Sequence, residues 1–396
     1  MQCLSRVALL FGFVAVGFGG SPGIAAAENE LQASSLVAEV TPTRTAERLQ
    51  KDVETLASPA YRGRAWPDSL RAGEFVADRF ASLGLRPLFG ESFRQVIPAG
   101  RAKLEGANIG AVLPGTDPAR AAEFVIVSAH HDHLGSRGTA IWPGADDNAS
   151  GVAAVLELAR RLAANPPARP VVFVTFDLEE RLLWGSQYFV ANPPFPLEDI
   201  RLFLTADMLG RRLGDLPIDE VFVMGTESAV PLRGLVQEAA EHAGQPVALL
   251  ATEIVGTRSD YGPFRRHEVP FLFFSTGEHR DYHRTSDTPE KLDYPRAARI
   301  VDLLEAIVRR SACSDEDLTW DPQSPDGVAE AAVLYRLATL LEERHAAGTR
   351  RLTTVELLLV RRMQTEAAAV VEAGRITPRQ RTWLVNGARA MLLLVF

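Results

Sequence analysis

Runs of apolar residues alternate with amphipathic stretches through the middle of the chain. Residues 124–129 and 170–176 are nearly continuous apolar runs, which are typical of strands covered on both faces. Between them, residues 150–164 carry apolar side chains at the spacing of one helix face. Alternation of this kind predicts parallel strands that are joined by crossover helices.

The same alternation continues on both sides of this central segment. Two helices are expected between Pro42 and Leu85, with a loop at residues 61–64, and a hairpin of residues 93–97 and 107–113 follows. Downstream patterns predict three more strands, at residues 200–206, 221–224 and 271–275, and three more helices, at residues 186–190, 232–242 and 296–310. The sequence therefore predicts an α/β fold with a mostly parallel or mixed central sheet and helices on both faces.

The composition changes near the C-terminal end of the chain. Residues 314–327 are rich in Asp, Pro and Ser, which predicts a linker. Three helical stretches follow, at residues 328–345, 353–373 and 377–394, and Gly348 and Gly374 are expected to separate them. We expect residues 328–396 to form a helical appendage to a main domain of residues 42–312. Arginines among their apolar positions argue against membrane insertion.

The first 27 residues have the pattern of a secretory signal. Arg6 is their only charge, residues 7–20 are apolar, and Ala25 to Ala27 provide small residues before Glu28. The apolar run is too short and too rich in glycine to favour a membrane span, although a retained N-terminal anchor is the alternative. We therefore expect an exported protein, periplasmic or secreted, that is cleaved near Ala27.

Bulk composition narrows the classes of function. With 46% hydrophobic and 23% charged residues, the 396-residue chain can bury a full core. Its net charge of −8 gives no basic surface for nucleic acid or an anionic membrane. Cys313 would be the only cysteine of the mature chain, so no intramolecular disulfide is expected. These features do not indicate an oligomeric state.

Metal-competent side chains directly follow three of the predicted strands. His130 follows the first, Glu179 and Glu180 follow the second, and Asp207 follows the third. In an open α/β sheet, ligands bind at this carboxyl edge. Imidazole and carboxylate groups together hold zinc while leaving a position open for water, and such groups from several strands suit a two-metal hydrolase. The sequence therefore predicts a metal-dependent enzyme.

Several neighbouring polar residues have structural interpretations. His131 is expected to be a packing or loop histidine, and His133 a structural residue or one that supports a ligand. Asp146 is a candidate helix cap ahead of the helix that starts at Ser150. Asp207 is harder to explain in this way. An unpaired buried carboxylate is costly, and a metal would neutralise it.

Taken together, the motifs resemble the M28 family of co-catalytic zinc aminopeptidases. The resemblance runs from about Val53 to Leu303. It rests on spaced motifs that follow one order: His130-x-Asp132, Gly144-Ala-Asp-Asp147-Asn-Ala-Ser-Gly151, Glu179-Glu180, Asp207-Met-x-Gly-Arg211, Ser259-Asp260 and Tyr282-His283-x-x-Ser286-Asp287. The resemblance implies the α/β fold of these enzymes and the removal of N-terminal residues from peptides.

The resemblance also implies a set of metal ligands. His130 and Asp207 would hold one zinc ion, Glu180 and His283 would hold the other, and Asp147 would bridge the two. In the family, the peptide bond that follows the bridging aspartate is cis. The bond between Asp147 and the next residue, Asn148, is therefore a candidate for this rare geometry.

Three further residues would support the reaction. Asp132 would orient His130 and fix its tautomer. Glu179 would be the general base, which takes a proton from the attacking water and passes it to the leaving amine. Tyr282 resembles a tyrosine that, in some members, hydrogen-bonds the oxyanion.

Other functions compete with an aminopeptidase. Carboxypeptidases and dipeptidases of the family keep the whole ligand set, so attack at the other end of a peptide is the first alternative. Glutaminyl cyclases use a related site with one zinc, but the Glu-Glu pair is altered there, and Glu179-Glu180 favours hydrolysis. A metal-free binding module would have lost ligands that this chain retains. A serine hydrolase is disfavoured because neither Ser150 nor Ser259 lies in a Gly-x-Ser-x-Gly elbow.

Overall fold

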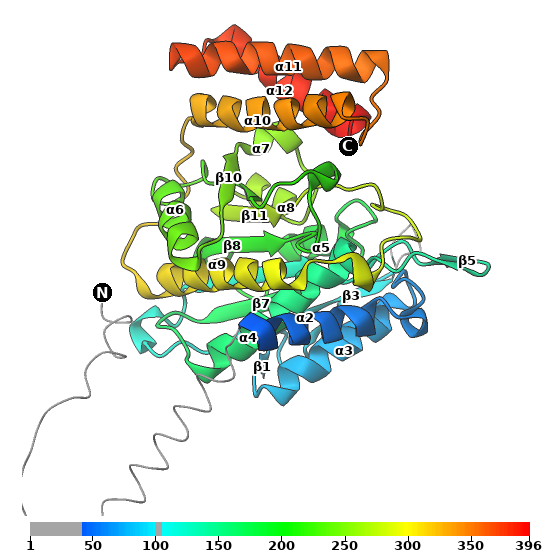
Figure 1. The fold of residues 1–396 in the computed structure, drawn as a ribbon. Helices are drawn as coiled ribbons and strands as arrows, with labels where there is room; N and C mark the ends of the chain where they lie inside the picture. The colour runs from blue at the N-terminus through cyan, green and yellow to red at the C-terminus, as the bar shows by residue number, and fades with distance from the viewer. Residues whose placement is uncertain (1–41, 100–104) are drawn as a thin grey trace, which may run out of the picture.

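The computed structural model describes residues 42–99 and 105–396, so the predicted signal segment, 1–27, lies outside the described residues. The centre of the molecule is a nine-stranded sheet with the order β1-β3-β7-β4-β8-β11-β9-β10, in which β2 lies beside β3 (Figure 1). Its strands are β1 (Arg86–Pro87), β2 (Arg94–Ile97), β3 (Gly106–Leu113), β4 (Phe124–His130), β7 (Val171–Phe176), β8 (Ile200–Ala206), β9 (Val221–Met224), β10 (Val247–Leu250) and β11 (Phe271–Ser275).

The middle of this sheet is parallel. Strand β4 pairs in parallel with β7 on one side and with β8 on the other, and β8 pairs in parallel with β11. The edges are mixed, because β3 runs antiparallel to β7 and β9 runs antiparallel to β11. The carboxyl ends of β7, β4 and β8 therefore lie next to one another at a single edge.

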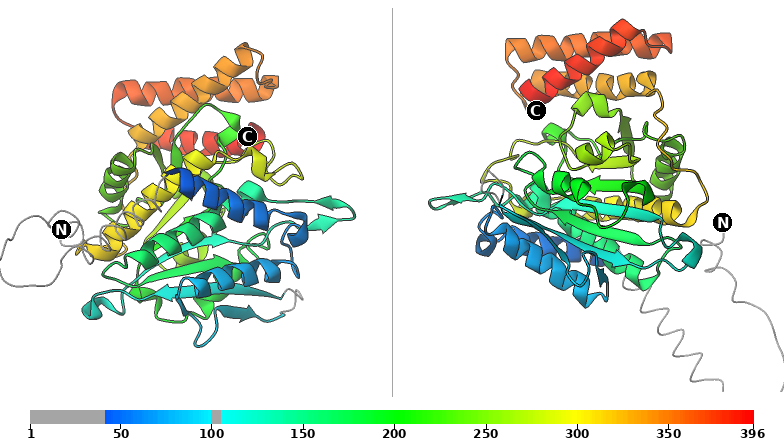
Figure 2. Two further views of the ribbon diagram at one scale, coloured as in Figure 1. Left: turned by 60° about the horizontal axis from the view of Figure 1, so that its bottom comes forward. Right: turned by 180° about the vertical axis from the view of Figure 1, so that it is seen from behind.

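Alternating side chains of the strands supply two separate cores. Val125 and Val127 of β4 contribute to one core and Ile126 to the other, and all three are buried. The first core is covered by α2 (Pro42–Leu56), α3 (Ser69–Ser82), α4 (Gly151–Ala164), α6 (Leu232–Ala243) and α9 (Tyr294–Cys313). The second is covered in part by α5 (Trp184–Ala191) and α8 (Tyr261–Arg266). The predicted α/β fold with helices on both faces is confirmed (Figure 2).

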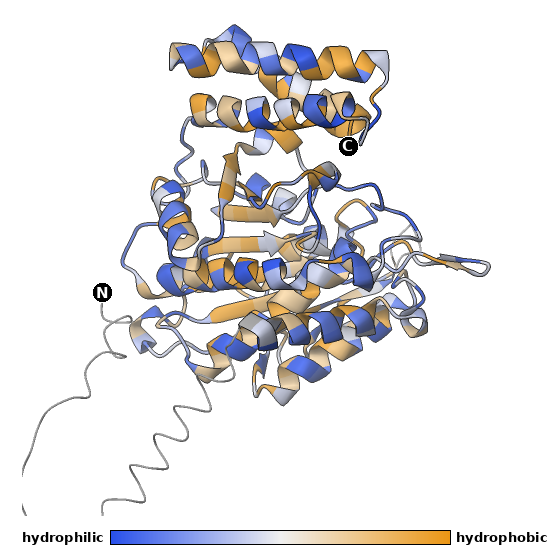
Figure 3. Ribbon diagram, viewed as in Figure 1, coloured by the Kyte–Doolittle hydropathy of each residue, from blue (hydrophilic) through white to orange (hydrophobic). Residues whose placement is uncertain are grey.

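The three predicted C-terminal helices are α10 (Gly327–Ala346), α11 (Thr354–Ala373) and α12 (Pro378–Leu394). Capping boxes at Thr353 and Thr377 begin the last two, and Gly374 ends α11 in the left-handed conformation. Their buried apolar side chains join the second core of the sheet. In Figures 1 and 3 these helices lie beside α7 (Thr252–Val255). Among the described helices, none is both long and apolar enough to cross a membrane.

The sequence patterns miss the shortest elements. Strand β10 follows Pro246 as a four-residue apolar run, and α7 is equally short, so neither has a measurable period. A two-stranded hairpin, β5 (Ser136–Arg137) and β6 (Ala140–Ile141), projects from the body (Figure 1). The antiparallel direction of β9 was also not predicted, because strand direction depends on pairing partners that the local pattern does not reveal.

Candidate metal centre

The residues predicted as ligands converge at the carboxyl edge of the sheet. His130 is the last residue of β4, Glu179 and Glu180 follow β7, and Asp207 follows β8 directly. Because β4 lies between the other two strands, these side chains meet over its end. Two loops complete the centre. One is the kinked turn η3 (Ala145–Ser150), which precedes α4 and carries Asp147, and the other follows β11 and carries His283.

A first group of donor atoms forms around His130. Its Nε2 atom lies 3.3 Å from Oδ1 of Asp147 and 3.3 Å from Oδ1 of Asp207. His130, Glu179 and Asp207 each offer a ligand atom, and these atoms lie within 4.8 Å of one another. Both His130 and Asp207 are buried.

A second group of donor atoms forms around Glu180. Nε2 of His283 lies 3.3 Å from Oε1 of Glu180 and 3.1 Å from Oδ2 of Asp147. His133 also reaches this group, since its Nδ1 atom lies 2.9 Å from Oε1 of Glu180 and 3.7 Å from Oδ2 of Asp147. The two oxygens of Asp147 thus face different groups, Oδ1 toward His130 and Oδ2 toward His283.

Asp132 links the segment that carries His130 to the segment that carries Glu179 and Glu180. Its Oδ1 atom lies 3.6 Å from Nδ1 of His130, and the same oxygen accepts a hydrogen bond from the backbone N–H of Glu179 at 3.0 Å. Oδ2 of Asp132 accepts from the N–H of Glu180 at 3.3 Å. The Asp132 carboxylate therefore holds the backbone of both glutamates, while Nδ1 of His130 lies 3.2 Å from the backbone carbonyl oxygen of the same residue.

The turn that carries Asp147 is held by many hydrogen bonds. Asp287 accepts from the backbone N–H groups of Asp146 and Asp147 at 3.0 to 3.1 Å. The fully buried Arg64 donates to the carbonyls of Gly144 and Asp147, and also to those of Leu56, His131 and Pro143. The Asp147–Asn148 peptide bond is cis, which confirms the prediction.

Electrostatics at the centre follow from the crowding of buried carboxylates. Burial raises the pKa of Glu179 well above its ordinary value, although His130 opposes this effect. Burial by itself would lower the pKa of His283, but hydrogen bonds to Asp147 and Glu180 raise it to about 10. Burial would likewise raise the pKa of Asp147, but the histidines around it keep that pKa well below its usual range. The buried carboxylates of the centre thus require a positive charge beside them to remain ionised.

This donor set fits divalent zinc. Imidazole nitrogens and carboxylate oxygens are the ligands that zinc prefers when no thiolate is present. Each group combines at least one histidine with carboxylates, and Asp147 can contribute to both. A cation at either position would neutralise side chains that are otherwise costly to bury together.

Some residues at the centre were not given their full roles by sequence reasoning. His133 contacts Glu180 directly. Its place in the His-x-Asp-His segment does not by itself predict this contact, because Glu180 follows a different strand. Asp146, considered as a helix cap, instead accepts from the N–H of Gly210, and its Oδ2 lies 3.2 Å from Nε2 of His279. Tyr282 stacks on the ring of His283 with centroids 3.9 Å apart, and it lines the same pocket as the ligands.

Comparison with known proteins agrees with the motifs. A family model described as peptidase family M28 matches residues 108–308, which is half of the chain. The protein YfbL of Escherichia coli is 25% identical over 295 residues, or 65% of this chain and 85% of that protein. Aminopeptidase YwaD of Bacillus subtilis is 26% identical over 194 residues, or 47% of this chain and 40% of that enzyme, so the match spans less than half of its length.

Solved structures share the fold. LapA aminopeptidase of Legionella pneumophila superposes with a TM-score of 0.56 at 19% identity, over 72% of this chain and 76% of that one. LapB of the same organism gives a TM-score of 0.57 at 20% identity, with the same coverage. With a family match over half of its length and the predicted motifs in order, the chain belongs to peptidase family M28.

Proposed function

We propose that this peptidase is an exported di-zinc aminopeptidase, which removes N-terminal residues from peptides. The observation that carries the proposal is the position of the Asp147 carboxylate, whose two oxygens lie 3.3 Å from Nε2 of His130 and 3.1 Å from Nε2 of His283. A carboxylate between two donor groups is the arrangement that holds two ions about 3.5–4 Å apart. His130 and Asp207 would hold one ion, and Glu180 and His283 the other.

The chain's own residues then have distinct tasks. Zinc at these positions would polarise the scissile carbonyl and lower the pKa of the attacking water. Glu179, whose pKa is raised by burial, would accept the proton of that water and pass it to the leaving nitrogen. Asp132 keeps Glu179 in place through the backbone N–H. Tyr282 would donate a hydrogen bond from its hydroxyl to the oxyanion that develops on the carbonyl oxygen.

The aminopeptidase proposal requires a free amino group on the substrate. A peptide with a free N-terminus is expected to be cleaved at its first bond, and its N-acetylated twin to react at least about 100-fold more slowly, since one recognised charged group is worth some 2–3 kcal/mol. The measurement is kcat/KM for both peptides with the zinc-loaded protein. A peptide amidated at its C-terminus is the control. Equal rates for the acetylated pair, or loss of activity on amidation alone, would favour a carboxypeptidase or dipeptidase.

Export is a separate part of the proposal. The mature N-terminus is expected at or close to Glu28, because Ala25 and Ala27 are small residues at the −3 and −1 positions of a signal cleavage site. N-terminal sequencing of the protein recovered outside the cytoplasm measures this directly. An Ala27→Arg variant, which disrupts the −1 position, should retain the segment. Met1 or Gln2 at the N-terminus of most of the exported wild-type protein would contradict the proposal.

A further inference from the structure

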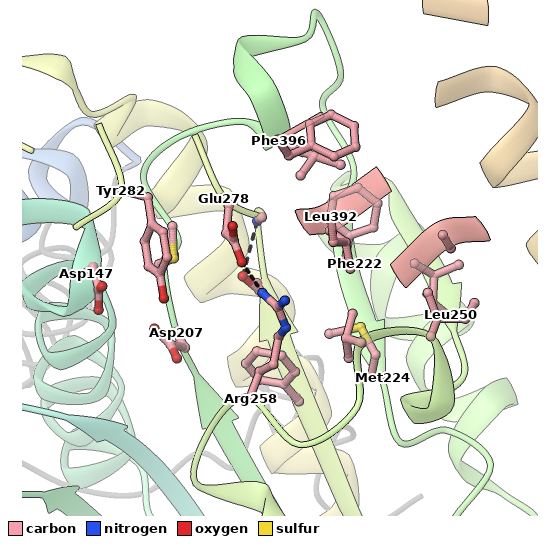
Figure 4. A pocket seen from close by; sticks show the side chains of 18 of the residues that line it. Asp147, Asp207, Phe222, Met224, Leu250, Arg258, Glu278, Tyr282, Leu392 and Phe396 are labelled. Atoms are coloured by element: carbon pink, nitrogen blue, oxygen red, sulfur yellow. Dashed lines mark hydrogen bonds and ion pairs between the residues drawn. The ribbon is translucent and has the colours of Figure 1, made fainter. Parts of the chain in front are cut away.

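One continuous cavity leads from the candidate metal centre to an apolar end. Its volume is about 340 Å³, at the small end of the range of roughly 300–1,000 Å³ for small-molecule sites. Asp147, Asp207 and Tyr282 lie at one end of the cavity, and Leu250 and Leu392 lie at the other (Figure 4). The apolar end of this cavity suits an apolar side chain of a substrate whose backbone lies at the metal centre.

Two parts of the chain that are far apart in sequence build the apolar end. The sheet and α7 contribute Phe222, Met224, Leu250 and Ile254. The C-terminal helices contribute the opposite wall: Leu334 and Leu337 from α10, and Ala388, Met391 and Leu392 from α12. The helical region thus forms part of the cavity that contains the predicted catalytic residues.

Two charged side chains between the ends of the cavity pair with each other. The Arg258 guanidinium forms an ion pair with the Glu278 carboxylate, and in Figure 4 this pair lies between the ligand end and the apolar end. Because each charge has a partner, neither is left to select a charged substrate side chain. Binding at the far end of the cavity then depends on burial of apolar surface.

The helical wall is fixed to the peptidase core at several points. Arg381 of α12 forms ion pairs with Glu253 of α7 and with Glu330 of α10. The other carboxylate oxygen of Glu330 accepts a hydrogen bond from the backbone N–H of Ala251, beside the cavity. Arg389 of α12 donates to the carbonyl of Glu253 at 2.8 Å. These contacts hold α10 and α12 at a defined distance from the sheet.

We propose that the C-terminal helices α10 and α12 are the specificity element of the enzyme. Their apolar side chains close the pocket that receives the side chain of the N-terminal residue, so that bulky apolar residues such as leucine and phenylalanine are removed in preference to alanine. This inference rests on the proposed aminopeptidase function. It assigns a role to a region, residues 327–396, that lies outside the part of the chain matched to the family.

Leu392→Trp tests this assignment, because Leu392 is half-buried and lines the cavity. The larger ring should fill the apolar end. We expect the ratio of kcat/KM for leucyl over alanyl substrates to fall at least about 10-fold, the size of effect that pocket volume has on apolar side chains. Leu393→Trp is the matched control. Leu393 is the next residue of α12, is 73% exposed and is not among the residues that line the cavity. The ratio of kcat/KM for leucyl over alanyl substrates in Leu393→Trp should therefore stay near that of the wild type.

A second variant, Leu392→Ala, should shift the preference in the opposite direction, from leucyl toward phenylalanyl substrates. The inference is overturned if Leu392→Trp and Leu393→Trp change the ratio equally, or if Leu392→Trp slows all substrates alike.

The proposed function fails if the wild type releases no N-terminal residue from any peptide. In that case, calorimetric titration with free phenylalanine and free alanine tests the pocket separately. If Leu392→Trp loses phenylalanine binding and Leu393→Trp keeps it, the proposal that α10 and α12 close the pocket is still supported. Unchanged phenylalanine binding in Leu392→Trp, or no phenylalanine binding by the wild type, overturns that proposal.

Discussion

Glu179→Gln is expected to lower kcat by about 10²–10⁴-fold while both zinc ions remain bound, because general acid–base catalysis contributes about this much. Glutamine has nearly the shape of glutamate but cannot accept the proton of the attacking water. The backbone N–H of Glu179 still binds Asp132, so the segment should keep its position. KM should change little, since the side chain acts on the proton and not on substrate binding. Steady-state kinetics and metal analysis of the same preparation measure both quantities.

Glu180→Gln is the matched comparison, because the two glutamates are adjacent and both follow β7. Oε1 of Glu180 lies within 3.3 Å of ring nitrogens of His133 and His283, which assigns it to the second donor group. This variant should therefore lose zinc from one site as well as activity. If Glu179→Gln also lost one equivalent of zinc, Glu179 would be a metal ligand and the assignment of the general base would be wrong.

Asp147→Ala is expected to abolish both zinc binding and detectable turnover. It removes one oxygen from the group around His130 and the other from the group around His283, so neither position keeps its full set of ligands. Because ligands that bind only the folded state stabilise it, zinc should raise the Tm of the wild type and leave the Tm of Asp147→Ala nearly unchanged. Metal content, activity and Tm with and without a chelator measure the three effects.

His131→Asn provides a control for this experiment. His131 is fully buried beside the proposed ligand His130, but its Nδ1 atom contacts the Thr175 hydroxyl at 3.0 Å and burial lowers its pKa to about 3. The variant should retain two zinc ions per chain even if its Tm falls. Two equivalents of tightly bound zinc in Asp147→Ala would contradict the bridging role.

The sequence was sufficient to predict the elements whose apolar pattern is long and regular. Residues 125–129 are buried because β4 lies in the parallel middle of the sheet, and a continuous apolar run is what such a position requires. The three C-terminal helices carry explicit start and stop signals, such as Thr353 and Gly374, so their ends could be predicted closely. The convergence of His130, Glu180 and Asp207 followed from the rule that ligands gather at the carboxyl edge.

Features that depend on contacts between distant segments could not be predicted. The contact of His133 with Glu180 arises only when the loops after β4 and β7 pack together. Helical periodicity identified α10 and α12 and marked their apolar faces, but it could not show which surface those faces cover. The core they share with Phe222 and Met224 of the sheet makes them part of the cavity. The local sequence pattern indicates which side chains are buried, whereas tertiary packing decides which segments these side chains contact.

The buried guanidinium of Arg64 has a consequence for how the centre takes up metal. Five backbone carbonyls accept its hydrogen bonds, and Asp287 accepts hydrogen bonds from the backbone N–H groups of Asp146 and Asp147 in the same turn. The conformational entropy of the turn that presents Asp147 is therefore lost during folding, before any ion arrives. The affinity of the centre for a cation should therefore not be reduced by the cost of ordering this turn.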